Sequence, residues 1–168
     1  MKELYQYFVE GADEKHLIET LKTNMRLIKP GKIQILNVVQ ERISDLKLRV
    51  IADGTILVFV FDTDVGATEI LYENIKKASK TPNVKQVLCI TQVKNIEDEL
   101  VRSTNITSIE ELLNSRSKTD FKRDFLRERN VKQKLESHCF DIKKLWCKNP
   151  PEPFTQIRND AKLIKNND

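Results

Sequence analysis

The chain has 168 residues, a formal net charge of +4, 39% hydrophobic and 32% charged residues, which is typical of one globular domain with a well-charged surface. No apolar stretch is long enough to span a bilayer, and residues 1–11 lack the apolar core of a signal peptide, so we expect a cytoplasmic protein without membrane contacts. The cysteines, Cys89, Cys139 and Cys147, are odd in number and widely spaced, which disfavours a disulfide framework and a zinc site and leaves Cys89 as a buried residue.

Segments typical of strands alternate with segments typical of helices through the first half of the chain. The patterns predict strands over 4–9, 33–39, 56–61 and 84–91, and helices over 13–28, 43–50 and 67–79. The first helix shows an apolar stripe of Leu17, Ile18, Leu21, Met25 and Ile28. This alternation predicts an α/β fold with a parallel sheet of about four strands, helices on both faces and right-handed crossovers.

The third strand is the strongest signal. Its six apolar residues do not alternate with polar ones, which predicts a strand buried on both faces, and the run ends in Asp62 and Asp64. If the extended backbone continues to Asp64, both carboxylates lie on one face and can bind one cation or a pair of cations. The alternative is that one of these aspartates caps a helix beginning near Ala67.

The last third of the chain is predicted to be helical. A polar helix is expected over 94–103 and a Ser-x-x-Glu capping box opens the segment 108–114. We therefore divide the chain into an α/β domain, 1–104, and a basic helical C-terminal extension, 105–168, that packs on it.

The segment 116–134 is rich in Lys and Arg and carries Phe121 and Phe125 one turn apart. It is interpreted as a basic helix that holds a phosphate backbone without reading sequence, and the alternative is a solvated helix face. The candidate contacts are Lys118, Lys122, Arg123, Arg127, Arg129 and Lys132.

Acidic residues follow the predicted strands at their carboxyl ends. Glu10 follows the first strand, Asp62 and Asp64 the third, and Glu97 the fourth. Because these ends share one edge of a parallel sheet, we expect the acids to converge there, where cations are needed to offset their repulsion. Oxygen-only ligands suit Mg²⁺ or Mn²⁺, and two such ions support phosphoryl transfer.

This pattern resembles the Toprim domain, in which Glu-Gly follows the first strand and Asp-x-Asp ends a later one. Here the motifs are Glu10-Gly11, with Asp13 close behind, and Asp62-x-Asp64. Asn95–Leu100 is similar to the acidic third motif of OLD-family (overcoming lysogenization defect) Toprim nucleases. The resemblance covers residues 4–101 and implies a Rossmann-like, Toprim-like fold.

The resemblance also implies roles for the acids. Glu10 would be a general base or a metal ligand, Asp62 and Asp64 would hold Mg²⁺, Glu97 would complete a second metal site, and Asp13 would be an auxiliary ligand. Glu99 is the second candidate for the third-motif acid, and the alternative for it is a capping or surface role. Asn95 is the expected N-cap of this helix.

These features predict a metal-dependent nuclease acting on DNA or RNA, with a partner ATPase or a second copy of the chain as candidate partners. The alternative is a catalytically silent Toprim-like module that binds nucleic acid or a protein. Residues 59–68 also resemble the first motif of haloacid-dehalogenase phosphatases, but Gly66 stands where that motif has Thr and the strand is the third. A receiver-like domain would require an acidic pair after the first strand and a later Lys, and neither is evident.

Overall fold

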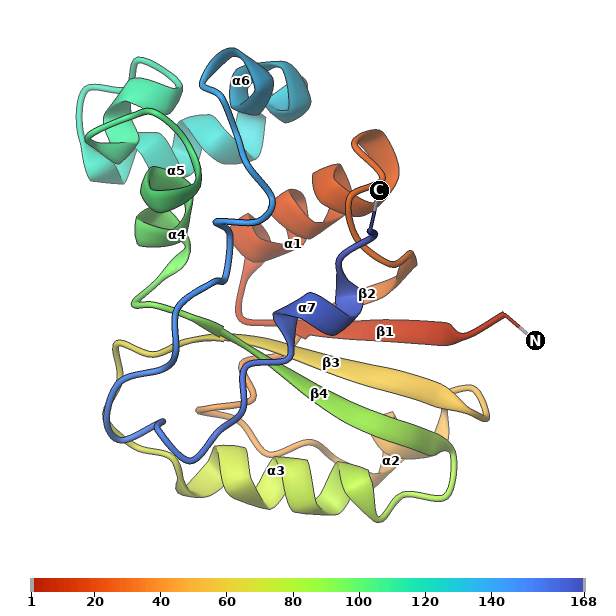
Figure 1. Ribbon diagram of the computed structural model, residues 1–168. Helices are drawn as coiled ribbons and strands as arrows, with labels where there is room; N and C mark the ends of the chain where they lie inside the picture. Colours follow the sequence, from red (N-terminus) through yellow and green to blue (C-terminus); the bar gives the residue numbers. More distant parts are fainter. Residues whose placement is uncertain (1, 168) are drawn as a thin grey trace.

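The computed structural model describes residues 2–167 and contains a four-stranded parallel sheet in the order β2-β1-β3-β4 (Figure 1). The strands are β1 (Leu4–Val9), β2 (Gly31–Ile35), β3 (Thr55–Asp62) and β4 (Val84–Gln92). The helical elements are α1 (Ala12–Glu19), the π-helical turn η1 (Thr20–Asn24), α2 (Asp45–Arg49), α3 (Glu69–Ser79), α4 (Ile96–Ser103), the 3₁₀ turn η2 (Ile109–Leu112), α5 (Lys118–Arg127), α6 (Val131–Ser137) and α7 (Ala161–Ile164). Across residues 2–167, no helix is both long and apolar enough to cross a membrane.

The strand β3 lies between β1 and β4 and is buried on both faces from Thr55 to Phe61. Its alternate side chains enter two separate cores: Ile56, Val58 and Val60 face one, and Leu57, Phe59 and Phe61 face the other. Figure 1 shows α1 and α7 on one face of the sheet and α2 and α3 on the opposite face. The sequence therefore predicts this part of the fold correctly, because only a strand covered on both sides has no polar alternation.

Element boundaries differ from the sequence prediction in the first two units. The first helix ends at Asn24 instead of 28, and Ile28 is buried in an antiparallel bridge with Lys165. The second strand begins at Gly31, where an added Cβ would lie 2.4 Å from the Tyr5 carbonyl oxygen, and it ends at Ile35. Only glycine permits this approach of the two backbones.

The short helix α2 has a different buried side from the one predicted. Leu46 and Val50 are 71% and 75% exposed, whereas Leu48 is buried. A five-residue helix makes little more than one turn, so the spacing of its apolar residues cannot define a stripe. The buried contacts of this segment come from Ile43 and Ile51 on either side of the helix.

The segment predicted as one basic helix forms two, α5 and α6. Asn130 separates them, because its side chain accepts a hydrogen bond from the Gln133 backbone and so begins α6 as an N-cap. Phe121 and Phe125 are buried as expected, with ring centroids 5.4 Å apart. The capping box at Ser108 and the N-cap at Asn95 are also present, as predicted.

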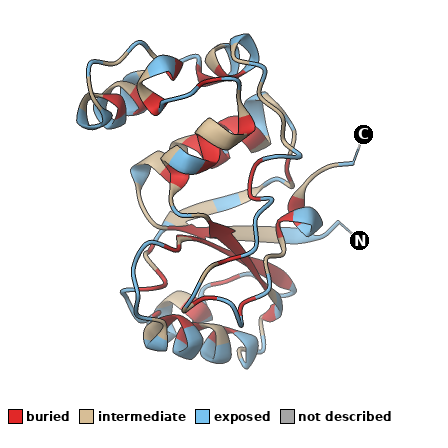
Figure 2. Cartoon of the chain, turned by 60° about the vertical axis from the view of Figure 1, so that its left-hand side comes forward, coloured by how far each residue is buried: buried red, intermediate tan, exposed pale blue. Residues whose placement is uncertain are grey.

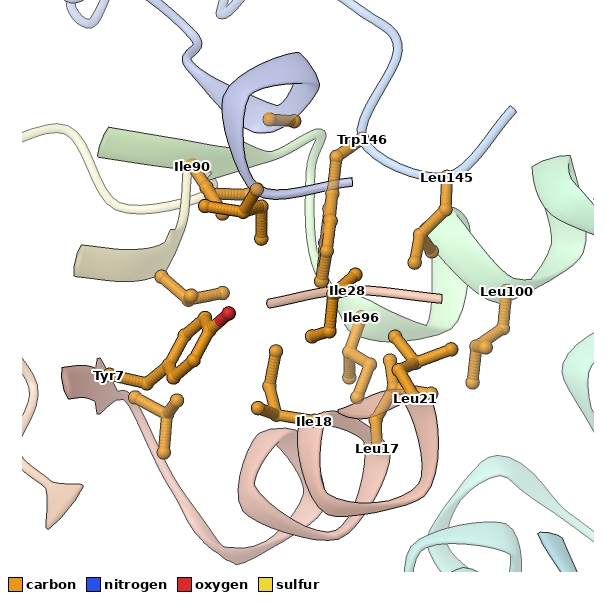
Figure 3. Packing of buried hydrophobic residues seen from close by; sticks show 14 of the residues in the cluster. Tyr7, Leu17, Ile18, Leu21, Ile28, Ile90, Ile96, Leu100, Leu145 and Trp146 are labelled. Atoms are coloured by element: carbon orange, nitrogen blue, oxygen red, sulfur yellow. The ribbon is translucent and has the colours of Figure 1, made fainter. Parts of the chain in front are cut away.

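Residues 138–160 are mostly irregular rather than helical, but they contribute to both cores. Trp146 enters the core on the α1 side, where Figure 3 shows its ring reaching toward Ile28. Phe154 packs on the opposite face against Phe61, with ring centroids 6.0 Å apart. Asp160 then covers the outer edge of β4, accepting from the Cys89 backbone N–H and donating its own N–H to the Cys89 carbonyl. Figure 2 shows the buried residues of the chain concentrated in the sheet and on the helix faces that cover it, with exposed residues on the outer faces of the helices.

We predict that Phe154→Ala destabilises the whole sheet domain. Phe154 is fully buried, and truncating a buried phenylalanine costs about 3–5 kcal/mol. Urea denaturation should show this loss in a single transition, whereas Leu163→Ala, at a side chain 46% exposed, should change stability by about 0.5 kcal/mol or less. A separate early transition in Phe154→Ala would contradict one cooperative unit.

Candidate functional site at the carboxyl edge of the sheet

The sheet has a topological switch point between β1 and β3. The chain leaves β1 toward β2 on one side and leaves β3 toward β4 on the other, and a crevice outside the strand ends forms at such a point. Glu10 follows β1 directly and Asp62 ends β3. The Glu10 carboxylate Oε2 accepts a hydrogen bond from the Asp62 backbone N–H at 2.9 Å. Two of the predicted acids therefore meet at the place where α/β sheets bind ligands.

Asp62 is held in a largely desolvated position. The pKa of Asp62 is raised to about 9. Burial is the largest cause, and the charges of Glu10 and Glu14 act in the same direction. Its Oδ1 accepts a hydrogen bond of 2.6 Å from the side-chain amide of Gln92, which is fully buried at the end of β4. Gln92 in turn accepts a hydrogen bond from the Trp146 indole N–H at 3.2 Å. The C-terminal segment thus helps to orient Asp62.

Glu14 is a site residue that the sequence analysis does not name among the candidate acids, because it lies within the first helix and not directly after a strand. The side chain is only 6% exposed. Burial raises its pKa to about 7, and the charges of Glu10 and Asp13 act in the same direction. The sequence does indicate the burial of Glu14. This residue precedes Leu17, Ile18 and Leu21 by three, four and seven residues, so it lies on the buried stripe of α1. We call Glu10, Asp13, Glu14, Asp62, Asp64 and Glu97 the acidic edge.

Asp13 and Glu97 form the other side of the acidic edge, next to Lys122 of α5. Burial raises the pKa of Asp13, and the charge of Glu97 adds to the rise. The Asp13 Oδ1 atom is buried without a hydrogen-bond partner. The Lys122 Nζ lies 3.6 Å from a Glu97 carboxylate oxygen, and its charge opposes the rise in the pKa of both Glu10 and Asp13. One residue of the predicted basic helix therefore reaches the acids directly.

Asp64 does not share a strand face with Asp62. The two carboxylates would lie on one face only if the extended backbone continued to Asp64, and it does not. The strand β3 ends at Asp62, and the Thr63 side chain and backbone both donate hydrogen bonds to the Gln92 carbonyl at the end of β4. Asp64 lies exposed in the loop that follows, near enough for its charge to raise the pKa of Glu10 and Asp62. The capping alternative is wrong as well, since α3 begins at Glu69 with Thr68 as its N-cap.

Glu99 is neither a capping nor a surface residue. Its side chain is fully buried, forms an ion pair with Arg102 and accepts a hydrogen bond of 2.9 Å from the Trp146 backbone N–H. Burial raises its pKa to about 7. These contacts tie α4 to the C-terminal segment. Of the two candidates in this helix, Glu97 is the one that lies among the other acids.

The other basic candidates are all exposed on α5 and α6 or between them. Arg123 pairs with Asp120 and Asp124 at 3.3 Å, and Lys132 lies 3.9 Å from Glu136. Within residues 2–167, no ion pair involves Lys118, Arg127 or Arg129. These three side chains keep their full positive charge available.

The chemistry of the acidic edge suits a hard cation, but its geometry is not yet that of a metal site. Carboxylate oxygens are the ligands of Mg²⁺ and Mn²⁺, and Asp13 offers a buried oxygen without a partner. Among the described residues, however, no three His, Cys, Asp or Glu side chains are placed to hold one ion. Binding would therefore require carboxylates of the acidic edge to change rotamer and approach one another.

No family model, no curated protein and no solved structure matches this chain. We therefore assign the fold and the acidic edge from the geometry described above alone.

We predict that Asp62→Asn stabilises the metal-free protein, increasingly so as the pH rises. The pKa of Asp62 is about 9 when folded and about 3.9 when unfolded, so its contribution to stability is full below about pH 4 and is lost as the pH rises toward 9. Asparagine keeps the acceptor for Gln92 and does not titrate. At pH 8 in a chelator, the melting temperature should rise by at least about 3 °C, the shift that about 1 kcal/mol produces in a chain of this size.

The matched control is Asp64→Asn, which removes an exposed carboxylate and should raise the melting temperature less. Equal melting temperatures of Asp62→Asn and the parent protein from pH 4 to pH 9 would show that Asp62 is ordinarily ionised in the folded state.

Proposed function

We propose that the chain is a Toprim-like, metal-dependent nuclease that hydrolyses phosphodiester bonds. The observation that carries the proposal is the direct contact of Glu10 with Asp62 at the switch point of a parallel sheet. Glu14 acts on Asp62 from α1, and Glu97 of α4 acts on the neighbouring Asp13. Concentrating partly buried acids at one edge of the sheet is unfavourable unless a cation compensates their charge. A cation-binding function explains why the fold keeps them together.

The residues divide into two groups within the acidic edge. Asp62 and Asp64 would hold a first Mg²⁺ or Mn²⁺ together with Glu10, which can alternatively serve as the general base, and Glu14 supports this group. Glu97 and Asp13 would hold a second ion. Bound divalent cations would supply positive charge for the phosphate oxygens and lower the pKa of a bound water.

The basic residues offer a path for nucleic acid toward this edge. Lys122 lies against Glu97, and Lys118, Arg127, Arg129 and Lys132 are exposed along the same helices. A phosphate backbone lying on α5 would pass the acids at Lys122. Contacts of this kind supply affinity and register but little sequence specificity.

A second candidate is a Toprim-like module that binds nucleic acid or a protein without cutting. The observation in its favour is that no three donors among residues 2–167 are placed for one ion. Both candidates use the same basic surface, so cleavage is what distinguishes them.

The first test is cleavage of a substrate panel with Mg²⁺ or Mn²⁺: plasmid, single-stranded DNA and structured RNA. We expect metal-dependent cleavage of at least one of them, and Asp62→Asn should lower kcat/KM by at least about 100-fold, about 2.7 kcal/mol of transition-state stabilisation. Nucleic-acid affinity should be retained, since Asp62 is not one of the Lys and Arg residues of α5 and α6 that would contact the phosphates.

Millimolar Mg²⁺ or Mn²⁺ should also raise the melting temperature of the parent protein by mass action, and this shift should disappear in Asp62→Asn. A parent protein that binds nucleic acid but neither cuts it nor responds to metal is the non-catalytic module.

The second test concerns the basic surface. The double variant Arg127→Ala/Arg129→Ala should weaken binding to all sequences. It should also flatten the dependence of log affinity on log salt concentration, because binding with fewer phosphate contacts releases fewer counterions from the nucleic acid. The matched control is Lys76→Ala/Lys80→Ala, which removes two exposed charges from α3 and the residue that follows it. If the two double variants have the same affinity and salt slope, α5 and α6 are a solvated face and the nucleic-acid path lies elsewhere.

A further inference from the structure

A cavity separate from the acidic edge opens beside α7. Its volume is about 860 Å³, and its lining comes from residues 142–149 and 159–167, including Trp146 and Ala161. No member of the acidic edge lines it. Cavities of about 300–1,000 Å³ are the usual size of small-molecule sites, so this one is large enough for an organic ligand.

The charge of this C-terminal cavity is positive. Lys143, Lys162 and Lys165 line it, and none of its described lining residues is acidic. Within residues 2–167, none of these three lysines takes part in an ion pair. Lys143 and Lys162 are exposed, while Lys165 is half-buried and donates a hydrogen bond to the Leu145 carbonyl. The charges of Glu99 and Asp141 reach Lys165, but three lysines without an ion pair among the described residues still favour an anion in this cavity.

The remaining lining adds apolar and amide groups. Ile142 supplies partly exposed apolar surface, the buried Trp146 and Ala161 lie beneath it, and the Asn149 side chain supplies an amide. Trp146 is fixed from below, because its backbone N–H bonds Glu99 and its indole N–H bonds Gln92. The floor of the cavity is therefore rigid, as a preorganised site requires.

We propose that the C-terminal cavity binds a small organic phosphate, with its phosphates among the lysines and its apolar part against Ile142, above the buried Trp146 and Ala161. A phosphate carries up to two negative charges, so a diphosphate compensates three ammonium groups better than a single carboxylate does. The proposal is independent of nuclease activity, since no residue of the acidic edge takes part.

The test uses the full chain in metal-free buffer, with ADP as the probe and calorimetry as the measurement. ADP should bind with one-to-one stoichiometry. Adenosine, which lacks phosphate, and pyrophosphate, which lacks the apolar part, should each bind at least about tenfold more weakly, a difference of about 1.4 kcal/mol. Equal binding of adenosine would refute the role of the lysines, and equal binding of pyrophosphate would refute the role of the apolar wall.

Charge reversal locates the site. Lys143→Glu and Lys162→Glu should each weaken ADP binding at least about tenfold, whereas Lys144→Glu, at an exposed neighbour outside the cavity, should stay within about twofold. All three side chains are exposed, so the variants should fold. Equal losses in all three would mean general electrostatic attraction and would overturn the proposal.

Cys147 provides a second readout, because it lines the cavity and is exposed. In a Cys139→Ser background, Cys147 is the remaining exposed thiol of the three cysteines, since Cys89 is buried. ADP should slow its alkylation at least about fivefold when the site is saturated. An unchanged rate would overturn the proposal. Protection by a single-stranded oligonucleotide as strong as that by ADP would also overturn it and assign the cavity to the nucleic-acid path.

Discussion

The parallel pairing of β1 with β3 is the constraint on which the site depends. It places the first residue after β1 beside the last residue of β3, so Glu10 and Asp62 meet although 52 positions separate them in the chain. The pairing is fixed by the burial of β3 on both faces. A one-residue shift in its register would exchange the side chains that face the two cores, so core packing also sets the position of the acids.

The charges of the acidic edge are balanced only in part. Gln92 and the Asp62 backbone N–H provide hydrogen bonds, and Lys122 provides the nearest opposing charge. Lys122 reaches this position because Phe121 and Phe125 anchor α5, where the Phe125 ring packs edge-on against His16 of α1 at 5.3 Å. The raised pKa values of Asp62 and Glu14 show that protein groups alone do not offset the burial and repulsion of these carboxylates.

The C-terminal segment supports the site from behind. Trp146 bonds both Gln92, which orients Asp62, and Glu99, which anchors α4 and thereby the helix that carries Glu97. The same residue forms part of the floor of the C-terminal cavity. The cavity and the acidic edge are therefore connected by the hydrogen bonds from Trp146 to Gln92 and from Gln92 to Asp62.

The sequence by itself determined the four-stranded parallel sheet, the burial of β3, the N-cap at Asn95 and the presence of acids at the strand ends, because strand and helix periodicity and capping are local properties. Tertiary structure alone decided which acids meet. The place of Glu14 on the buried stripe of α1 follows from its spacing to Leu17 and Ile18, but its neighbours in the acidic edge come from other elements. Glu99 belongs to the core because the Trp146 backbone, 47 positions away, packs against α4. The residues after β3 are held to the end of β4 by hydrogen bonds from Thr63 to Gln92, 29 residues away, and such long-range pairings have no signature in the local sequence.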